Sequence, residues 1–247
     1  MLGRMHEPPA SVQALIEDWW RRGSPRQPGV DWNRTLWEEK FPAYSTLFAE
    51  LPVPLDRPAV QGRCEKLHCG AFRADEAFLL TMVWGYGVTG YGWWRTKRVL
   101  EHNADIGPQL TAVAMMLHTD NGAMLAYRAL ADDRRLQFLG PAFGTKFLYF
   151  CSASARHPAL ILDQLVAKWL RVNTTLSLDP VPWNSETYAQ WLNHAYSWAD
   201  SLHIRPDELE SCIFEDQYNK QATIRAANAG RHCKTPASKS VHERSLL

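Results

Sequence analysis

The sequence has little net charge, few cysteines and no clean apolar run of membrane length. Its 247 residues contain 27 Lys and Arg against 26 Asp and Glu, which gives a net charge of +1. This balance excludes a histone-like protein that holds nucleic acid by bulk positive charge, so any nucleic-acid-binding face must be local. The five cysteines are an odd number scattered over a long chain, which indicates reduced thiols in a cytoplasmic protein.

No segment is typical of a membrane anchor or a secretory leader. The longest uncharged stretch, residues 77–94, has four glycines in its second half, so we expect a helix followed by a loop. Residues 1–10 contain Arg4, Glu7 and two prolines where a secretory leader needs an apolar run. We therefore expect a protein with no membrane partner.

Helical periodicity is the clearest pattern in the chain. Apolar residues recur at helical spacing from Val12 to Trp20 and from Tyr188 to Leu202, and Pro206 with the acids after it is typical of a helix start. Strand-like alternation is confined to Cys64–Arg73, which suggests a hairpin or an edge strand. The fold class is therefore mainly α, with further helices expected at about 31–50 (kinked at Pro42), 75–84, 93–102, 108–131 in two pieces, 145–152 and 164–172.

The C-terminal segment differs in charge from the rest. Residues 217–247 contain six basic residues and one acidic residue, with few large apolar side chains. We expect a helical domain over residues 1–230 and a basic, flexible tail over 231–247. A solvated tail and a contact with a DNA backbone are both compatible with this composition.

Residues 139–150 are the stretch that carries the most chemical information. Gly140 and Gly144 bound a predicted turn at the start of an apolar helix, and the free amides of a helix N-terminus can bind an anion such as a DNA phosphate. Residues Asp132–Phe138 could form the helix before this turn. The sequence thus predicts a helix-hairpin-helix over about 132–150.

Lys146 and Asp163 are the candidate catalytic pair. We expect Lys146 in the first turn of its helix, where the helix dipole and nearby aromatic residues favour the neutral, nucleophilic amine. Asp163 follows the apolar run 159–162 and precedes a helical run, so it is a natural N-cap. Two adjacent helix starts could therefore bring an amine and a carboxylate to one cleft.

The order of glycine turn, Gly144-Thr145-Lys146, apolar helix and capping Asp163 resembles the helix-hairpin-helix DNA glycosylase superfamily. The resemblance covers roughly residues 75–215, is nearest to the 8-oxoguanine glycosylase type, and extends to a bacterial branch that includes phage-defence glycosylases acting on hypermodified bases. It implies two helical lobes flanking a cleft, a monomeric cytoplasmic enzyme, and double-stranded DNA with a modified base as partner. It also implies that Lys146 attacks the sugar C1′ and that Asp163 stabilises the cationic sugar.

Under this resemblance, further residues receive expected roles. The candidates for phosphate binding are Gly140, Gly144, Thr145, Arg95, Lys97 and Arg98, and the candidates for the base pocket or a duplex wedge are Trp84, Tyr86, Trp93 and Phe214. Each has a plainer explanation as well, because aromatic residues also pack under loops and charged residues also cover solvated helix faces.

Two cofactor motifs are matched only in part. Residues 85–90 fit G-x-G-x-x-G, but the run before them is predicted to be helical, whereas a dinucleotide site needs a preceding strand. Cys64, His68 and Cys69 lack the spacing of zinc ligands, and no second group of ligands completes a zinc site. No CxxC pair points to an iron-sulfur cluster. We expect no metal or cofactor.

Three functions stay open at this point. The first is a glycosylase that removes a hypermodified base such as glucosylated hydroxymethylcytosine in phage defence. The second is an 8-oxoguanine repair glycosylase, with or without strand cleavage. The third is a non-catalytic helix-hairpin-helix module that only grips DNA.

Overall fold

The computed structural model describes residues 6–232, and helices make up most of this range. The one β-like feature in the described part is an isolated antiparallel bridge between Val30 and Leu55. The prediction of a mainly α protein is confirmed. The helices are α1 (Ala10–Arg21), α2 (Arg34–Lys40), η1 (Pro42–Tyr44), α3 (Ser45–Ala49), α4 (Arg57–Cys64), η2 (Glu65–Leu67), α5 (Ala74–Tyr86), α6 (Gly92–Glu101), α7 (Ile106–Met116), α8 (Gly122–Ala131), α9 (Pro141–Cys151), α10 (Gln164–Asn173), α11 (Ser185–Ser201) and α12 (Pro206–His232).

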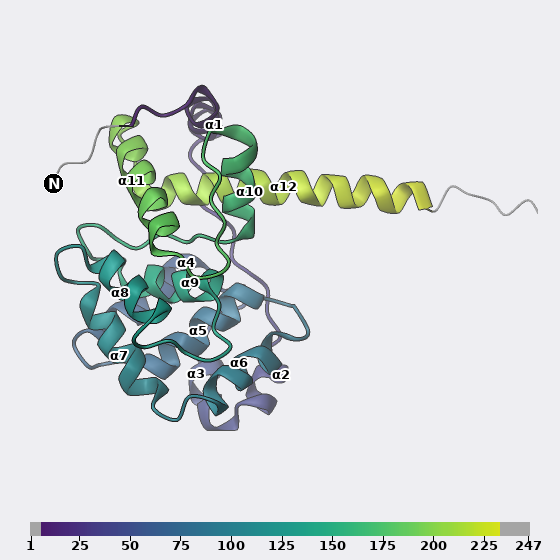
Figure 1. Cartoon of the computed structure of the whole chain (residues 1–247). Helices are drawn as coiled ribbons and strands as arrows, with labels where there is room; N and C mark the ends of the chain where they lie inside the picture. Colours follow the sequence, from purple (N-terminus) through teal and green to yellow (C-terminus); the bar gives the residue numbers. More distant parts are fainter. Residues whose placement is uncertain (1–5, 233–247) are drawn as a thin grey trace, which may run out of the picture.

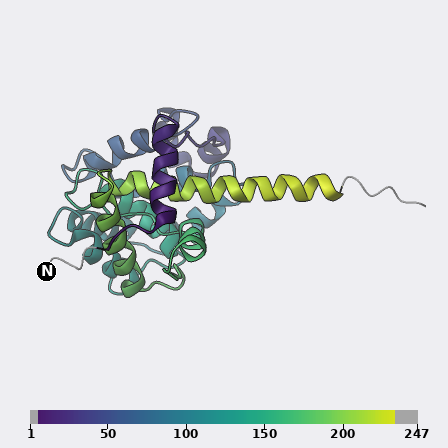
Figure 2. The same ribbon diagram turned by 90° about the horizontal axis from the view of Figure 1, so that it is seen from above.

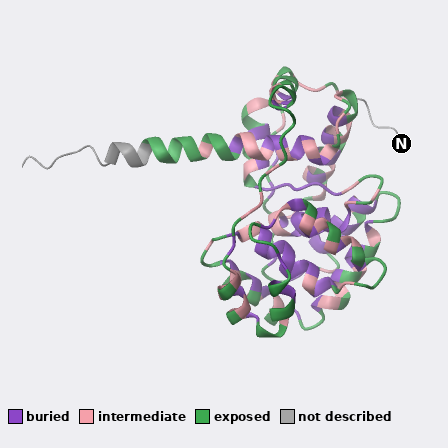
Figure 3. Cartoon of the chain, turned by 180° about the vertical axis from the view of Figure 1, so that it is seen from behind, coloured by how far each residue is buried: buried purple, intermediate pink, exposed green. Residues whose placement is uncertain are grey.

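The helices form two groups in space. Figure 1 shows α1, α10, α11 and the first half of α12 above a larger group that contains α2 to α9. Helix α5 is the centre of the larger group and packs against α4, α6, α7 and α9. It is buried on nearly all sides because residues 77–84 are almost entirely apolar, as expected for a core helix. Figure 3 shows this burial from behind.

Several predicted helices are confirmed with small shifts in their ends. Val12, Ile16 and Trp19 form the buried stripe of α1, and Trp191 and Trp198 belong to the buried stripe of α11. The region 31–50 is divided into α2, η1 and α3, with the break at the predicted position near Pro42.

The hairpin differs from the prediction. Asp132–Phe138 is a turn and not a helix, because α8 already ends at Ala131 and the charged run that follows has no apolar face to bury. Phe138 adopts a left-handed backbone with φ 66°, which is incompatible with a continuing helix. The second helix of the hairpin begins at Pro141 and not at 145, since proline suits the first helical position.

One further expectation is corrected. Cys64–Arg73 forms no hairpin or edge strand, and contains the last residue of α4, the 3-10 helix η2 and turns. Helix α12 continues to His232, and the division into a domain over 1–230 and a tail over 231–247 stays a prediction. Residues 233–247, most of the predicted tail, lie outside the described residues. Figures 1 and 2 show the second half of α12 extending away from the body.

Candidate active site

Lys146 and Asp163 form a buried ion pair where α9 and α10 meet. The Lys146 Nζ donates a hydrogen bond to Asp163 Oδ2 at 2.8 Å. Lys146 is 7% exposed and Asp163 9% exposed, so each has only a small opening to solvent. The structure therefore brings together the two residues that the sequence singled out as catalytic candidates.

Local sequence explains how Asp163 is positioned. Its Oδ1 accepts hydrogen bonds from the amides of Leu165 and Val166, which makes it the N-cap of α10 as predicted. The other oxygen, Oδ2, is left to face Lys146. One carboxylate thus caps a helix and holds the lysine at the same time.

The extended segment before Asp163 is held by hydrogen bonds to its backbone. The Thr145 hydroxyl accepts a bond from the Leu162 amide at 3.2 Å, and the Trp191 Nε1 donates to the Ile161 carbonyl at 3.1 Å. Thr145 precedes Lys146 in α9, so one helix turn anchors the segment that carries the acid and also supplies the amine. This explains why residues 17 positions apart meet.

The electrostatics of the pair favour an ionised acid. Burial by itself raises the pKa of the Asp163 carboxyl, but the Lys146 ammonium and the hydrogen bonds to this carboxylate outweigh burial and lower its pKa below the usual 3.8. Lys146 is the sixth residue of α9 and lies in the second turn, not in the first turn as expected. The resting arrangement is an ammonium paired with a carboxylate, so a nucleophilic amine requires loss of a proton from Lys146.

Aromatic rings cover the stem of Lys146. Phe143 lies one helical turn before Lys146, with its ring centroid 5.5 Å from Nζ. Tyr86 stacks on Phe143 with centroids 4.2 Å apart and an interplanar angle of 24°. A Cβ on Gly85 would lie 2.5 Å from the Phe143 ring and 3.3 Å from Lys146 Cδ. The glycine at position 85 therefore leaves room for the lysine and its aromatic cover.

The start of α9 is the predicted phosphate-binding region. Gly140 is the exposed N-cap and no side chain caps the helix. The Gly144 amide, in contrast, donates to the Gly140 carbonyl, and Gly144 packs under Trp183, where a Cβ would lie 2.2 Å from the ring. Thr145 is fully buried. The phosphate-binding prediction therefore fits the N-cap region, while Gly144 and Thr145 have packing and anchoring roles in this structure.

The basic residues of α6 lie beside the hairpin. The Arg98 guanidinium lies 3.8 Å from the centroid of the exposed Phe138 ring in the hairpin turn, and 4.9 Å from that of Trp94. Arg95 is exposed over Tyr91, and Lys97 is exposed with Glu101 3.6 Å away. These side chains are accessible to a DNA backbone, as their predicted role requires.

The predicted base-pocket residues do not form one surface. Trp84 is buried in the core, where its ring packs against Phe150 and the Arg57 guanidinium, so it offers no face to a base. Trp93 is half-buried with the Lys40 ammonium over its ring, and Phe214 is half-buried and stacks with Tyr218 on α12. Only Tyr86 contacts the cover of the Lys146 site.

Sequence reasoning missed a buried ion pair close to the Lys146–Asp163 pair. Arg57 of α4 bonds Glu210 of α12, and the charge of Glu210 is close enough to Asp163 and Lys146 to interact with both. The one signal in the sequence was the position of Glu210 on the inward face of its helix. Glu210 lies one turn before Ile213 and two turns before Gln217, and both of these residues are buried. Nothing in the sequence identifies its partner.

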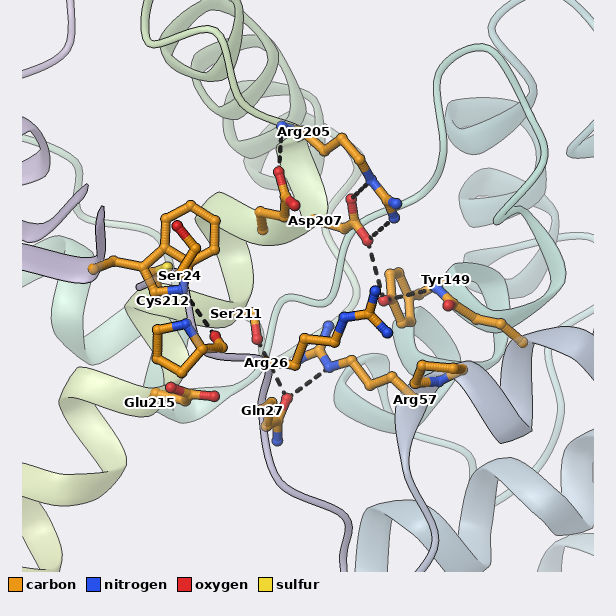
Figure 4. Close-up of a pocket in the computed structure, with 15 residues that line it drawn as sticks. Ser24, Arg26, Gln27, Arg57, Tyr149, Arg205, Asp207, Ser211, Cys212 and Glu215 are labelled. Atoms are coloured by element: carbon orange, nitrogen blue, oxygen red, sulfur yellow. Dashed lines mark hydrogen bonds and ion pairs between the residues drawn. The ribbon is translucent and has the colours of Figure 1, made fainter. Parts of the chain in front are cut away.

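Arg57 also lines a polar cavity of about 520 Å³ (Figure 4). Neither Lys146 nor Asp163 lines it. Its wall mixes guanidinium and carboxylate groups with Trp19 and the Tyr149 hydroxyl, so it could hold a ligand with both donors and acceptors. The polar lining residues include Arg26, Gln27, Arg57, Arg205, Asp207, Ser211 and Glu215.

Two kinds of feature are missing from the described part of the chain. No group of three or more His, Cys, Asp or Glu side chains within residues 6–227 is arranged to hold a metal ion. No helix in that range is long and apolar enough to span a membrane.

The fold and the site define a helical protein with a buried lysine-aspartate pair that joins the second turn of α9 to the start of α10. Residues 23–214 match the family described as "Putative 8-oxoguanine DNA glycosylase OGG-like protein", which covers most of the chain. The chain belongs to this OGG-like family. No curated protein and no solved structure matches it.

Proposed function

We propose that the protein is a DNA glycosylase that flips a modified base out of duplex DNA and releases it, with Lys146 as nucleophile. The observation that carries this proposal is the 2.8 Å contact between Lys146 Nζ and Asp163 Oδ2. Lys146 belongs to α9, whose N-terminus has no side-chain cap. Family membership supports the same reaction class. A base inside the stack cannot be reached, so flipping must precede the chemistry.

The reaction needs a free amine and a stabilised sugar cation. Asp163 is the hydrogen-bonded carboxylate next to Lys146, so it can accept the ammonium proton and pass it to the departing base. As the C1′–N bond breaks, its electron pair leaves with the base and the sugar becomes oxocarbenium-like. The negative charge of Asp163 stabilises that cation in a site with little water.

Lys146 then captures C1′. Its Nζ lone pair forms the new C1′–N bond, a proton moves from the now cationic Nζ to O4′ as the C1′–O4′ bond opens, and a protonated Schiff base remains. Borohydride reduces this Schiff base to a stable amine, so the intermediate can be trapped. The Tyr86–Phe143 stack lies beside Lys146, and we assign this aromatic pair to the flipped nucleotide.

The residues proposed to contact DNA phosphates are those of the predicted set that are exposed at the surface. We assign the exposed Gly140 end of α9 and the exposed side chains of α6, Arg95 and Lys97, to the DNA backbone. Arg98 lies beside Phe138 at the hairpin turn and completes this face.

Trapping on an abasic duplex tests the nucleophile without knowledge of the base. We expect the wild type to form a borohydride-stable adduct and Lys146→Gln to form none, whereas the control Lys168→Gln, on the exposed face of α10, keeps it. A Lys146→Gln variant that is still trapped would exclude this lysine. A wild type that binds duplex without trapping or base release would identify a DNA-binding module instead.

The released base decides between the two glycosylase functions. The family description favours 8-oxoguanine, and the alternative is a hypermodified cytosine attacked in phage defence. Incubation with an 8-oxoguanine duplex and with phage DNA containing glucosylated hydroxymethylcytosine, followed by identification of the free base, separates them.

A further inference from the structure

An exposed aromatic ring lies in the hairpin turn that precedes α9. Phe138 is 52% exposed, and its backbone is left-handed with φ 66°. This conformation is rare and strained for a residue with a bulky side chain. Strain of this kind persists only where the surrounding structure holds the residue in place, and it is concentrated at functional sites.

Hydrogen bonds on both sides of Phe138 hold the turn. The buried Asn103 side chain bonds both backbone groups of Gln137: its Oδ1 accepts from the amide at 2.9 Å, and its Nδ2 donates to the carbonyl at 3.2 Å. After Phe138, the Leu139 carbonyl accepts a hydrogen bond from Trp183 Nε1 at 3.2 Å. The ring is therefore presented from a fixed backbone.

Side chains at the C-terminal end of α6 surround the Phe138 ring. The Arg98 guanidinium lies 3.8 Å from its centroid and 4.9 Å from that of Trp94, which is 47% exposed. The His102 ring meets Phe138 edge-on, with centroids 4.8 Å apart. The ion pair of α6 joins Lys97 to Glu101, and Arg98 has no acidic partner among the side chains that the structure describes.

This combination of groups fits a nucleotide in DNA. A base of any sequence can stack on an aromatic ring, and an unpaired guanidinium binds a phosphate strongly. Phe138 has no polar group, and it belongs to the residue types that proteins insert between base steps. Both requirements of an inserted residue, an open ring and a rigid mount, are met at Phe138.

The turn is also close to the proposed nucleophile. Phe138 is two residues before the N-cap Gly140, and Lys146 is the sixth residue of α9. At about 1.5 Å per residue within the helix and at most about 3.5 Å per residue before it, Phe138 lies within about 18 Å of Lys146. That distance corresponds to about five base steps of 3.4 Å along one strand.

We propose that Phe138 inserts into the duplex and fills the stacking gap that the flipped nucleotide leaves, while Arg98 binds a neighbouring phosphate. This inference rests on the proposed glycosylase function, which supplies the duplex and the flipped nucleotide. A ring in the gap keeps the neighbouring bases stacked and slows the return of the flipped nucleotide. Phe138 thus favours the open state of the DNA and takes no part in the bond changes at C1′.

Two variants of Phe138 and one control test the proposal. Phe138→Ala removes the ring, and Phe138→Trp replaces it with another flat aromatic ring. Trp20→Ala is the control, because it removes a ring that is 45% exposed on α1, in the other group of helices. Thermal unfolding of all three variants shows whether the fold is kept.

The measurement is the dissociation constant for two duplexes of the same sequence, one intact and one with a single tetrahydrofuran abasic site. Tetrahydrofuran has no aldehyde, so binding stays reversible. The wild type should prefer the abasic duplex, because its gap accepts the ring without loss of a base pair. Phe138→Ala should bind the abasic duplex at least about tenfold more weakly and the intact duplex within about twofold of the wild type, as expected for the loss of one stacking contact. Phe138→Trp should recover most of the preference, and Trp20→Ala should bind as the wild type does.

A second measurement reports insertion directly. The fluorescence of 2-aminopurine depends on how it is stacked, so we place this base opposite the abasic site. Binding of the wild type should change the fluorescence, and binding of Phe138→Ala at saturating concentration should leave it unchanged. Borohydride trapping of Phe138→Ala on a natural abasic duplex, also at saturation, should proceed at the wild-type rate because Lys146 and Asp163 are intact.

The outcomes separate this inference from the proposed function. Wild-type preference in Phe138→Ala would overturn the insertion, as would an equal loss of affinity on both duplexes or in Trp20→Ala. If Lys146→Gln abolishes trapping while Phe138→Ala keeps the preference, only the role of Phe138 fails. If Lys146→Gln is still trapped while Phe138→Ala loses the preference, the nucleophile fails and the insertion stands. A wild type that binds neither duplex would overturn both.

Discussion

The Arg57 guanidinium and the Glu210 carboxylate form a two-bond ion pair that joins the two groups of helices. The Nη1–Oε2 distance is 2.6 Å and the Nη2–Oε1 distance is 3.3 Å. Arg57 begins α4 in one group and Glu210 lies in α12 in the other, and both side chains are buried. The pair connects the helix packing to the site, because Glu210 also interacts with the charges of Lys146 and Asp163.

We expect Arg57→Met to lower the free energy of unfolding by about 3–5 kcal/mol, because it leaves a buried carboxylate without its partner. Removal of both charges in Arg57→Met with Glu210→Leu should recover most of this loss. The matched control is Arg63→Met on the same helix, whose pair with Glu50 is partly exposed and should contribute about 0–1 kcal/mol. Urea unfolding measures all three, and equal effects of the Arg57 and Arg63 variants would contradict the prediction.

The Lys146–Asp163 pair should stabilise the fold in a pH-dependent way. The pKa of Asp163 is lowered in the folded protein, because its lysine partner and hydrogen bonds outweigh burial, so its contribution is present above the ordinary pKa of 3.8. That contribution is lost as the pH falls below this value. The difference in unfolding free energy between wild type and Asp163→Asn should therefore be constant from about pH 5 to 7 and shrink below about pH 4. A difference that grows on acidification would contradict the lowered pKa.

Asp163→Asn should also slow base release strongly while DNA binding persists, because the amide keeps an oxygen for the helix cap but lacks the negative charge that we propose stabilises the sugar cation. Single-turnover release and a gel-shift titration measure the two effects separately. Unchanged release would remove Asp163 from the reaction.

Gly85→Ala should impair the reaction through the packing around Lys146 and not through a contact with DNA. The new methyl group would displace the Phe143 ring and crowd the Lys146 stem, and misplacement of a reacting group by about 1 Å can cost about 100-fold in rate. The control is Gly107→Ala in α7, where a Cβ meets nothing within 4 Å. The rate of borohydride trapping checks the prediction, and equal rates for the two variants would show that the packing at Gly85 does not position the lysine.

Thr145→Val should loosen the segment that carries Asp163. The substitution leaves the buried Leu162 amide without its acceptor, which costs about 1–3 kcal/mol of stability. Thr111→Val is the control, because the Thr111 hydroxyl bonds only its own helix at the surface. Thermal unfolding and trapping should both be reduced for Thr145→Val, and a normal melting temperature would contradict the anchoring role.

Local patterns in the sequence predicted the elements that depend on neighbouring residues. The apolar stripes of α1 and α11, the cap at Asp163 and the lysine of α9 are encoded within a few residues of where they act. The hairpin was predicted less well, because the end of α8 at Ala131 and the left-handed backbone of Phe138 are not apparent from the residues of Asp132–Phe138 alone. The prediction of a hairpin or an edge strand at Cys64–Arg73 was wrong because alternation over a short segment does not determine a strand without a pairing partner.

The sequence by itself determined a mainly α protein with an acid at one helix start and a lysine within another helix, because capping and helical periodicity are local properties. The tertiary structure decided that the amine and the acid touch, that Trp84 is in the core and that Glu210 meets Arg57 from a helix 153 positions away. These relationships depend on how helices distant in the sequence pack against one another. No local pattern encodes such packing, because it results from the joint burial of many side chains.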